Sequence, residues 1–150
     1  MPDRPRVSEV ACGKLGDSPL FYGGCLRVAL NEDEALIRIP FRKITVPIKA
    51  VLKIVSANRY VHWTLGERKG LEILYETPNG QKTVFFMSVN PRMWFETVER
   101  LGIKTEDPFD LRHASMAGRK LVNAFMFWAS VIGLIASIGL VIYGLFFFKA

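Results

Sequence analysis

The sequence predicts an α+β protein in which an antiparallel, β-rich domain closed by one C-terminal helix is followed by a single transmembrane helix. Three observations support this prediction. Residues 121–148 contain no charged side chain, although 23% of the whole chain is charged. Short apolar runs separated by turn residues precede that stretch, and one amphipathic segment follows them. The net charge of +6 over 150 residues excludes an acidic disordered tail.

The predicted organisation has four parts. They are an N-terminal extension at 1–20, a soluble domain at 21–102, a linker or juxtamembrane stalk at 103–120, and a transmembrane helix at 121–148. The first twenty residues lack the apolar stretch of a secretory signal, so we expect no signal peptide.

Short strands should form the soluble domain. We expect them at 25–30 and 35–39 around an acidic loop at 31–34, at 44–46, at 60–63, and at 71–76 and 82–87. Asn79-Gly80 is a strong turn signal between the last two. Alternation along 71–76 predicts one buried face and one wet face, with Glu72 and Glu76 on the wet one. Residues 66–70 are interpreted as a charged turn.

The closing helix has the clearest local signals. Asn90 is a suitable N-cap, Pro91 suits the first helical position, and Gly102 follows the last turn. The apolar stripe between them consists of Trp94, Val98 and Leu101. We expect Trp94 to pack against the sheet.

This order of elements resembles the pleckstrin-homology-like (PH-like) superfold, including the GRAM-type and bacterial PH-like domains. Residues 44–55 look like the strand and turn that those domains place before their second sheet, and the helix at 90–101 fits their closing helix. The resemblance covers just over half of the chain and implies a binding module. In lipid-binding members, basic residues cluster around the first hairpin loop. Here we take that loop to be the acidic 31–34, so a specific phosphoinositide pocket is not expected.

The apolar stretch 121–148 is long enough to cross a membrane. As a helix its 28 residues extend about 42 Å, more than the roughly 30 Å hydrocarbon core requires. A buried core helix is the alternative, but such a helix rarely needs so many uninterrupted apolar residues. Arg112, Arg119 and Lys120 precede the stretch and Lys149 follows it, which places the N-terminal domain in the cytoplasm.

Small residues recur along the predicted span and could let a second helix approach closely. They are Ala129, Ser130, Gly133, Ser137 and Gly144. Because such residues are common in membrane helices, chance spacing is the alternative.

We find no grouping typical of an enzyme and predict no catalytic residue, cofactor or metal. His62 and His113 are far apart, no phosphate-binding loop occurs, and no serine lies in a GxSxG motif. Cys12 and Cys25 form no CxxC pair and are expected to be free thiols.

A basic run is the most informative charge feature, because eight Lys and Arg between residues 38 and 69 face one acidic residue, Glu67. The candidate lipid- or partner-binding residues are Arg38, Arg42, Lys43, Lys49, Lys53 and Arg59. Near an anionic bilayer these cations would be attracted to the surface. The alternative is that strands project them to different faces, so that no patch forms.

The leading functional hypothesis is a membrane-anchored, cytoplasm-facing module that recruits or positions a protein partner, with a possible weak contact to anionic lipid. An accessory single-pass subunit of a larger membrane complex is the first alternative, and a small membrane-bound enzyme is the second. Nucleic-acid binding is not expected, because no recognised motif accompanies the positive charge.

Overall fold

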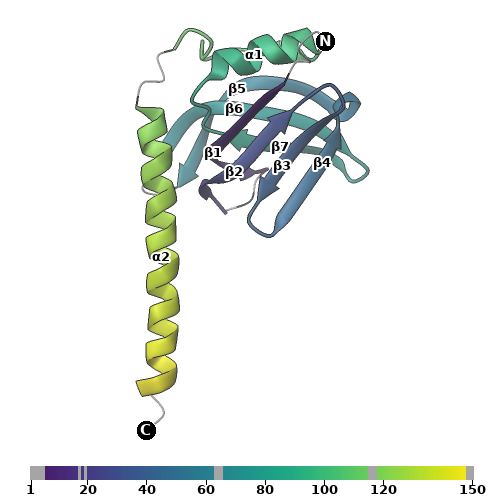
Figure 1. Ribbon diagram of the computed structural model, residues 1–150. Coiled ribbons are helices and arrows are strands. Elements are labelled where there is room, and N and C mark those ends of the chain that lie inside the picture. The colour runs from purple at the N-terminus through teal and green to yellow at the C-terminus, as the bar shows by residue number, and fades with distance from the viewer. Residues whose placement is uncertain (1–5, 17, 19, 63–65, 115–117, 148–150) are drawn as a thin grey trace.

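The computed structural model describes residues 6–16, 18, 20–62, 66–114 and 118–147. These residues form an eight-stranded mixed sheet, a short helix α1 and a long C-terminal helix α2 (Figure 1), which confirms the predicted α+β class. The strands are β1 (Val7–Leu15), β2 (Tyr22–Leu30), β3 (Glu34–Ile39), β4 (Arg42–Pro47), β5 (Val51–His62), β6 (Gly66–Thr77), β7 (Gly80–Phe86) and β8 (Lys104–Glu106). The helices are α1 (Pro91–Arg100), α2 (Arg119–Phe147) and the 3-10 turn η1 (Ile48–Ala50).

The strand order is β4-β3-β2-β1-β7-β6-β5-β8, with every neighbouring pair antiparallel except β5 and β8. Strand β1 joins the two halves of the sheet, because it pairs with β2 along most of its length and with β7 from Gly13 onward. A methyl group built at Gly13 would lie 2.2 Å from the carbonyl oxygen of Phe85. Glycine therefore permits the close approach of β1 and β7 that joins the halves.

Three predicted boundaries differ from the structure. Part of the predicted N-terminal extension, Val7–Leu15, is strand β1 at the centre of the sheet. Residues 66–70, interpreted as a turn, begin β6 and pair with β5. The predicted linker contains β8, and Leu111 within it is buried. The folded domain therefore extends on both sides of 21–102.

Helix α1 closes the main apolar core of the sheet, as predicted. This inner core includes Phe86 of β7 and Trp94, Phe95 and Val98 of α1. Asn90 caps it by accepting a hydrogen bond from the backbone N–H of Met93, and Pro91 is its first residue. Trp94 is fully buried and packs edge-on against Phe86, with 4.8 Å between the ring centroids. Its indole N–H donates to Glu9 on β1 over 2.9 Å, so α1 is fixed to the strand that joins the two halves.

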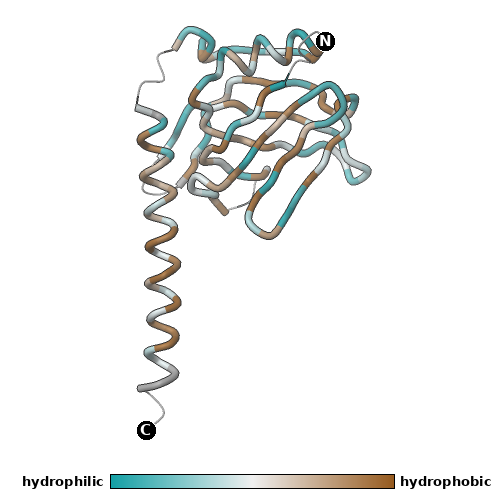
Figure 2. Tube along the Cα trace, viewed as in Figure 1, coloured by the Kyte–Doolittle hydropathy of each residue, from teal (hydrophilic) through white to brown (hydrophobic). Residues whose placement is uncertain are grey.

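A second apolar cluster lies on the outer face of the sheet. It consists of Cys12, Ala57, Val61, Phe85 and Met87, with Phe21 and Met126 packed against it. Met126 belongs to α2, so the first turns of this helix cover the outer face while α1 covers the inner core. Beyond these turns α2 is exposed and apolar (Figure 2), and over Lys120–Gly144 it is long and apolar enough to cross a membrane.

Candidate functional site

A cavity with a volume of about 680 Å³ lies at the end of the sheet opposite α1. Three segments far apart in the sequence form it: the β1–β2 connection, the start of β4, and the β6–β7 hairpin, where β6 ends and β7 begins. The lining residues are Leu15, Gly16, Ser18, Leu20, Tyr22, Arg42, Ile44, Tyr75, Thr77, Gln81, Lys82 and Thr83. We call this cavity the open-end pocket.

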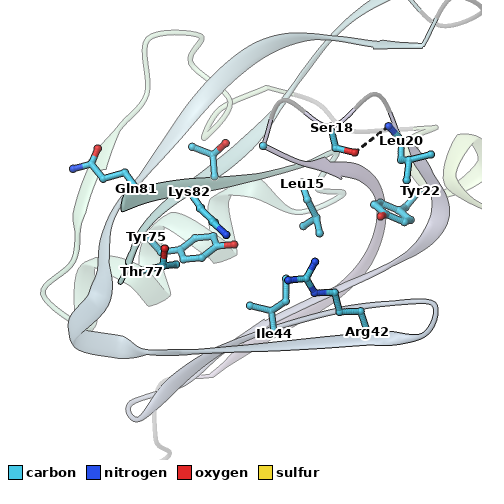
Figure 3. A pocket seen from close by; sticks show the side chains of 12 residues that line it. Leu15, Ser18, Leu20, Tyr22, Arg42, Ile44, Tyr75, Thr77, Gln81 and Lys82 are labelled. Carbon is cyan, nitrogen blue, oxygen red and sulfur yellow. Dashed lines mark hydrogen bonds between the residues drawn. The ribbon is translucent and has the colours of Figure 1, made fainter. Parts of the chain in front are cut away.

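The open-end pocket combines an apolar floor with two cations. Figure 3 shows Arg42 from β4 and Lys82 from β7 extending into the same space, with Leu15 and Tyr75 beside them. None of the described lining residues is a carboxylate, and within the described part of the chain neither cation forms an ion pair. Burial raises the pKa of the Tyr75 hydroxyl and the nearby Arg42 partly offsets this, so the phenol is neutral and available as a donor at pH 7. The pocket therefore presents positive charge and hydroxyl donors, which suits an anionic ligand.

The N-terminal turns of α2 dock against β2 at two consecutive glycines. A methyl group at Gly24 would lie 2.8 Å from both the carbonyl oxygen of Asn123 and the Cβ of Phe127, and one at Gly23 would lie 2.6 Å from the Ser130 hydroxyl. Gly24 also has a φ of +71°, which favours glycine. The pair thus forms a notch into which the helix backbone fits.

Asn123 lies at this contact and is 8% exposed. Its side-chain amide donates to the carbonyl of Met87 over 3.4 Å, while its Oδ1 has no hydrogen-bond partner among the described residues. An amide group buried against protein here is far less costly than one facing hydrocarbon. Asn123 therefore belongs to the contact with the β-domain, by which we mean β1 to β8 together with α1.

The direction of α2 follows from these contacts. Gly24 contacts Asn123 and Phe127, whereas the preceding residue, Gly23, contacts Met126 and Ser130, about one turn later in α2. Helix α2 therefore runs antiparallel to β2 and continues past the end of the domain where β2 begins. That end carries the open-end pocket and the β3–β4 turn, which is the lowest part of the β-domain in Figure 1, and α2 extends beyond it.

The six predicted basic residues do not form one surface. Arg42 lines the open-end pocket, and Lys43 is its exposed neighbour. Lys49 lies in η1, close to the residues that follow α1, and does not line the open-end pocket. Lys53 forms an ion pair with Glu106 over 2.9 Å, and Arg38 is exposed along β3.

Arg59 is held in a structural contact. Its guanidinium makes two 2.9 Å hydrogen bonds to the carboxylate of Glu72. The side chain of Glu72 is only 6% exposed, so the prediction that it lies on a wet face is wrong. A buried carboxylate needs such a partner, and Arg59 supplies it on the outer face of the sheet.

The small residues of the predicted span have separate environments. Ser130 lies against Gly23 of the β-domain and donates to the carbonyl of Met126 over 2.8 Å. Ser137 donates to the carbonyl of Gly133 over 2.8 Å, and a methyl group at Gly133 or Gly144 would meet no described atom within 4 Å. Association through this helix stays a prediction.

Sequence reasoning missed most of the pocket. Lys82, Tyr75 and Tyr22 were not singled out, because each is an ordinary strand residue in its own segment. Their common location depends on β1, which lies between β2 and β7 and pairs with both. Cys12 and Cys25 are free thiols, and the described residues contain no cluster of three or more His, Cys, Asp or Glu that could hold a metal.

The comparisons with known proteins return no relatives: the chain matches no protein-family model, no curated protein and no solved structure. The functional argument therefore depends on the fold and the pocket themselves.

Proposed function

We propose that this chain is a membrane-anchored, cytoplasm-facing binding module whose β-domain is PH-like and whose open-end pocket takes the anionic head group of a lipid. The PH-like assignment is supported by the strand order, since β1 to β4 form one antiparallel half, β5 to β7 form the other, and α1 follows directly. β8 and the α2 contact are additions to that pattern.

The length of the apolar stretch supports a docked anchor. A span needs about 20 residues; counted back from the charged Lys149, these are 129–148. The remaining eight apolar residues, 121–128, are the part of α2 that docks on the β-domain. Trp128, which is 61% exposed, then falls at the near boundary of the hydrocarbon, where amphipathic aromatic residues are enriched.

The observation that carries the proposal is the placement of Arg42 and Lys82 in a cavity at the end toward which α2 continues. The boundary of the hydrocarbon core nearest the β-domain is then level with Ser130 and Gly23, so the mouth of the open-end pocket lies in the head-group region. Anionic lipids are the negatively charged ligands most concentrated there. This reverses the order of the sequence hypothesis, which placed a protein partner first. That partner stays a prediction, as does an accessory role in a larger complex.

The cytoplasmic side is proposed from the positive-inside bias. A membrane-impermeant amine reagent applied to intact cells should leave the β-domain lysines unmodified and should label them after permeabilisation. Labelling before permeabilisation would reverse the orientation.

The ligand can be tested with the full chain in nanodiscs of phosphatidylcholine, with or without a minor fraction of phosphatidylserine. A ligand that binds only the folded state raises stability, by about 2.7 kcal/mol at a hundredfold excess over Kd. We expect the anionic lipid to raise the Tm of the β-domain in the parent protein. The gain should be lost in the double variant Arg42→Ala/Lys82→Ala.

Lys49→Ala is the matched control, because Lys49 is an exposed cation that does not line the open-end pocket. It should retain the full increase. An equal increase in the double variant, or no increase in the parent protein, would remove the proposed ligand site. The same measurement with added inorganic phosphate in neutral nanodiscs distinguishes a lipid head group from a free anion.

A further inference from the structure

The β3–β4 turn presents an apolar side chain in a position that costs stability. Phe41 is 107% exposed at the tip of this turn, so its ring makes no packing contact that would stabilise the fold. Its φ is +66°, in the left-handed region that disfavours residues with a Cβ. Asn or Gly would suit this backbone better. An exposed aromatic side chain retained on a strained backbone points to an external contact.

The neighbours of Phe41 fit a lipid surface. Arg42 and Lys43 follow it directly, and both are exposed. Leu20, on the β1–β2 connection at the same end of the domain, is 62% exposed. An aromatic ring at the boundary of the hydrocarbon, with cations level with the phosphates, is the arrangement that membrane interfaces favour.

The position of α2 identifies the occupant of this surface. The helix packs closely against Gly23 and Gly24 and then continues past the end of the domain. Counting about 20 residues for the span places its near boundary at residue 129, next to Ser130 and level with Gly23. The β3–β4 turn lies at that end of the domain, so the bilayer crossed by α2 is the surface it would meet first (Figure 1).

We propose that Phe41 inserts into the head-group region of the membrane that α2 spans, with Arg42 and Lys43 against the lipid phosphates. The contact would hold the open-end pocket against the bilayer and fix the tilt of the β-domain. This inference rests on the proposed anchoring by α2, and it is independent of which ligand the pocket takes.

Photo-crosslinking in the full chain tests the contact. Benzoylphenylalanine is introduced singly at Phe41, at Ile135 or at Met93, and each protein is reconstituted in liposomes of phosphatidylcholine and phosphatidylserine. Ile135 reports on the predicted span, where it is 64% exposed. Met93 is 38% exposed on α1 at the opposite end of the domain and is the matched control. Because the Phe41 side chain is exposed, its replacement should not disturb folding.

We expect lipid adducts by mass spectrometry at positions 41 and 135 and none at 93. Adducts at 135 alone would overturn the inference and leave the anchor intact. No adduct at 135 would overturn the anchoring itself. A protein adduct at 41 without lipid, or equal lipid adducts at 41 and 93, would also overturn the inference, because the turn would then meet a polypeptide or would not approach lipid selectively.

Discussion

The contact between Arg59 and Glu72 allows a sharp test of whether a predicted binding cation is structural. Glu72 is buried on the outer face of the sheet, and Arg59 binds it through two parallel hydrogen bonds. In Arg59→Ala the carboxylate stays buried and loses its only ion-pair partner among the described residues. We expect a marked loss of stability without any change in the open-end pocket, which Arg59 does not line.

The magnitude follows from the exposure of the two partners. Breaking a fully buried pair costs about 3–5 kcal/mol, whereas fully exposed pairs contribute about 0.2–1 kcal/mol. The Arg59 side chain is 51% exposed and that of Glu72 is 6% exposed, so an intermediate cost of about 2 kcal/mol is expected. For a domain of this size, that corresponds to a decrease in Tm of roughly 10 °C.

The assay is thermal unfolding of the full chain in mild detergent, followed by the tryptophan fluorescence, to which the buried Trp94 contributes. Arg38→Ala is the matched control, because Arg38 is exposed and forms no ion pair with a described residue. It should change stability by less than about 0.5 kcal/mol. Adding Glu72→Gln should recover part of the loss, since a neutral amide is cheaper to bury. Equal Tm values for Arg59→Ala and Arg38→Ala would refute the reasoning.

Four further predictions concern the contact between α2 and β2, the β3–β4 turn, the stability at low pH and the thiol of Cys12. Gly24→Ala should loosen the contact of α2 with β2, because a Cβ there meets Asn123 and Phe127 at 2.8 Å. Peroxide should then oxidise Met126 faster. The control Gly139→Ala, where no described atom lies within 4 Å of the added Cβ, should leave the oxidation rate unchanged. Phe41→Asn should stabilise the detergent-solubilised protein by about 1 kcal/mol in denaturant unfolding, because it relieves the positive φ and removes no packing; a loss would contradict the exposed placement. Burial alone would raise the pKa of Asp107, but hydrogen bonds from Ser56 and from the backbone N–H groups of Arg112 and Leu111 outweigh it and lower that pKa below 3.8. Its carboxylate therefore stabilises the fold above about pH 4, and this contribution is lost as the pH falls through the lowered pKa. In Asp107→Asn the free energy of unfolding should consequently decrease less below about pH 4 than in the parent protein. Burial raises the pKa of the Cys12 thiol to about 11, so maleimide at pH 7 should modify Cys12 only on unfolding, and rapid labelling of the native protein would contradict its burial.

Local signals predicted much of the fold. The hairpins β2–β3 and β6–β7 and the helix α1 appear where turn residues, alternation and caps indicated them. These patterns are encoded within about ten residues, so one segment suffices to recognise them. Alternation did not predict which residues of the outer face are buried. Cys12 and Phe85 lie on that face and are buried because α2 covers it, although the face was expected to be wet.

Strand β1 was not recognised because its signals are non-local. Glu9 interrupts the apolar pattern, and such an interruption is typical of a solvated segment. In the structure its carboxylate accepts hydrogen bonds from Trp94, 85 residues away, and from Ser88. No local pattern encodes such a partner.

The site was predicted only in part for the same reason. Arg42 was named, but Lys82 was not, because the two meet only when β1 joins the halves of the sheet. The length of the apolar stretch is a further sequence signal, because it exceeds the roughly 20 residues of a transmembrane helix by about eight. That surplus, with Asn123 inside it, indicated a helix whose first turns pack on protein.

The docking of α2 has a practical consequence for how this molecule is divided into fragments. A fragment that stops before residue 119 would lose Met126 and leave Cys12, Phe85 and their neighbours facing water. Exposed apolar patches of this kind promote self-association. Such a fragment would bind detergent, vesicles or other copies of itself through a face that the intact chain keeps covered. The natural unit of this protein is thus the sheet with α1 and the first three turns of α2.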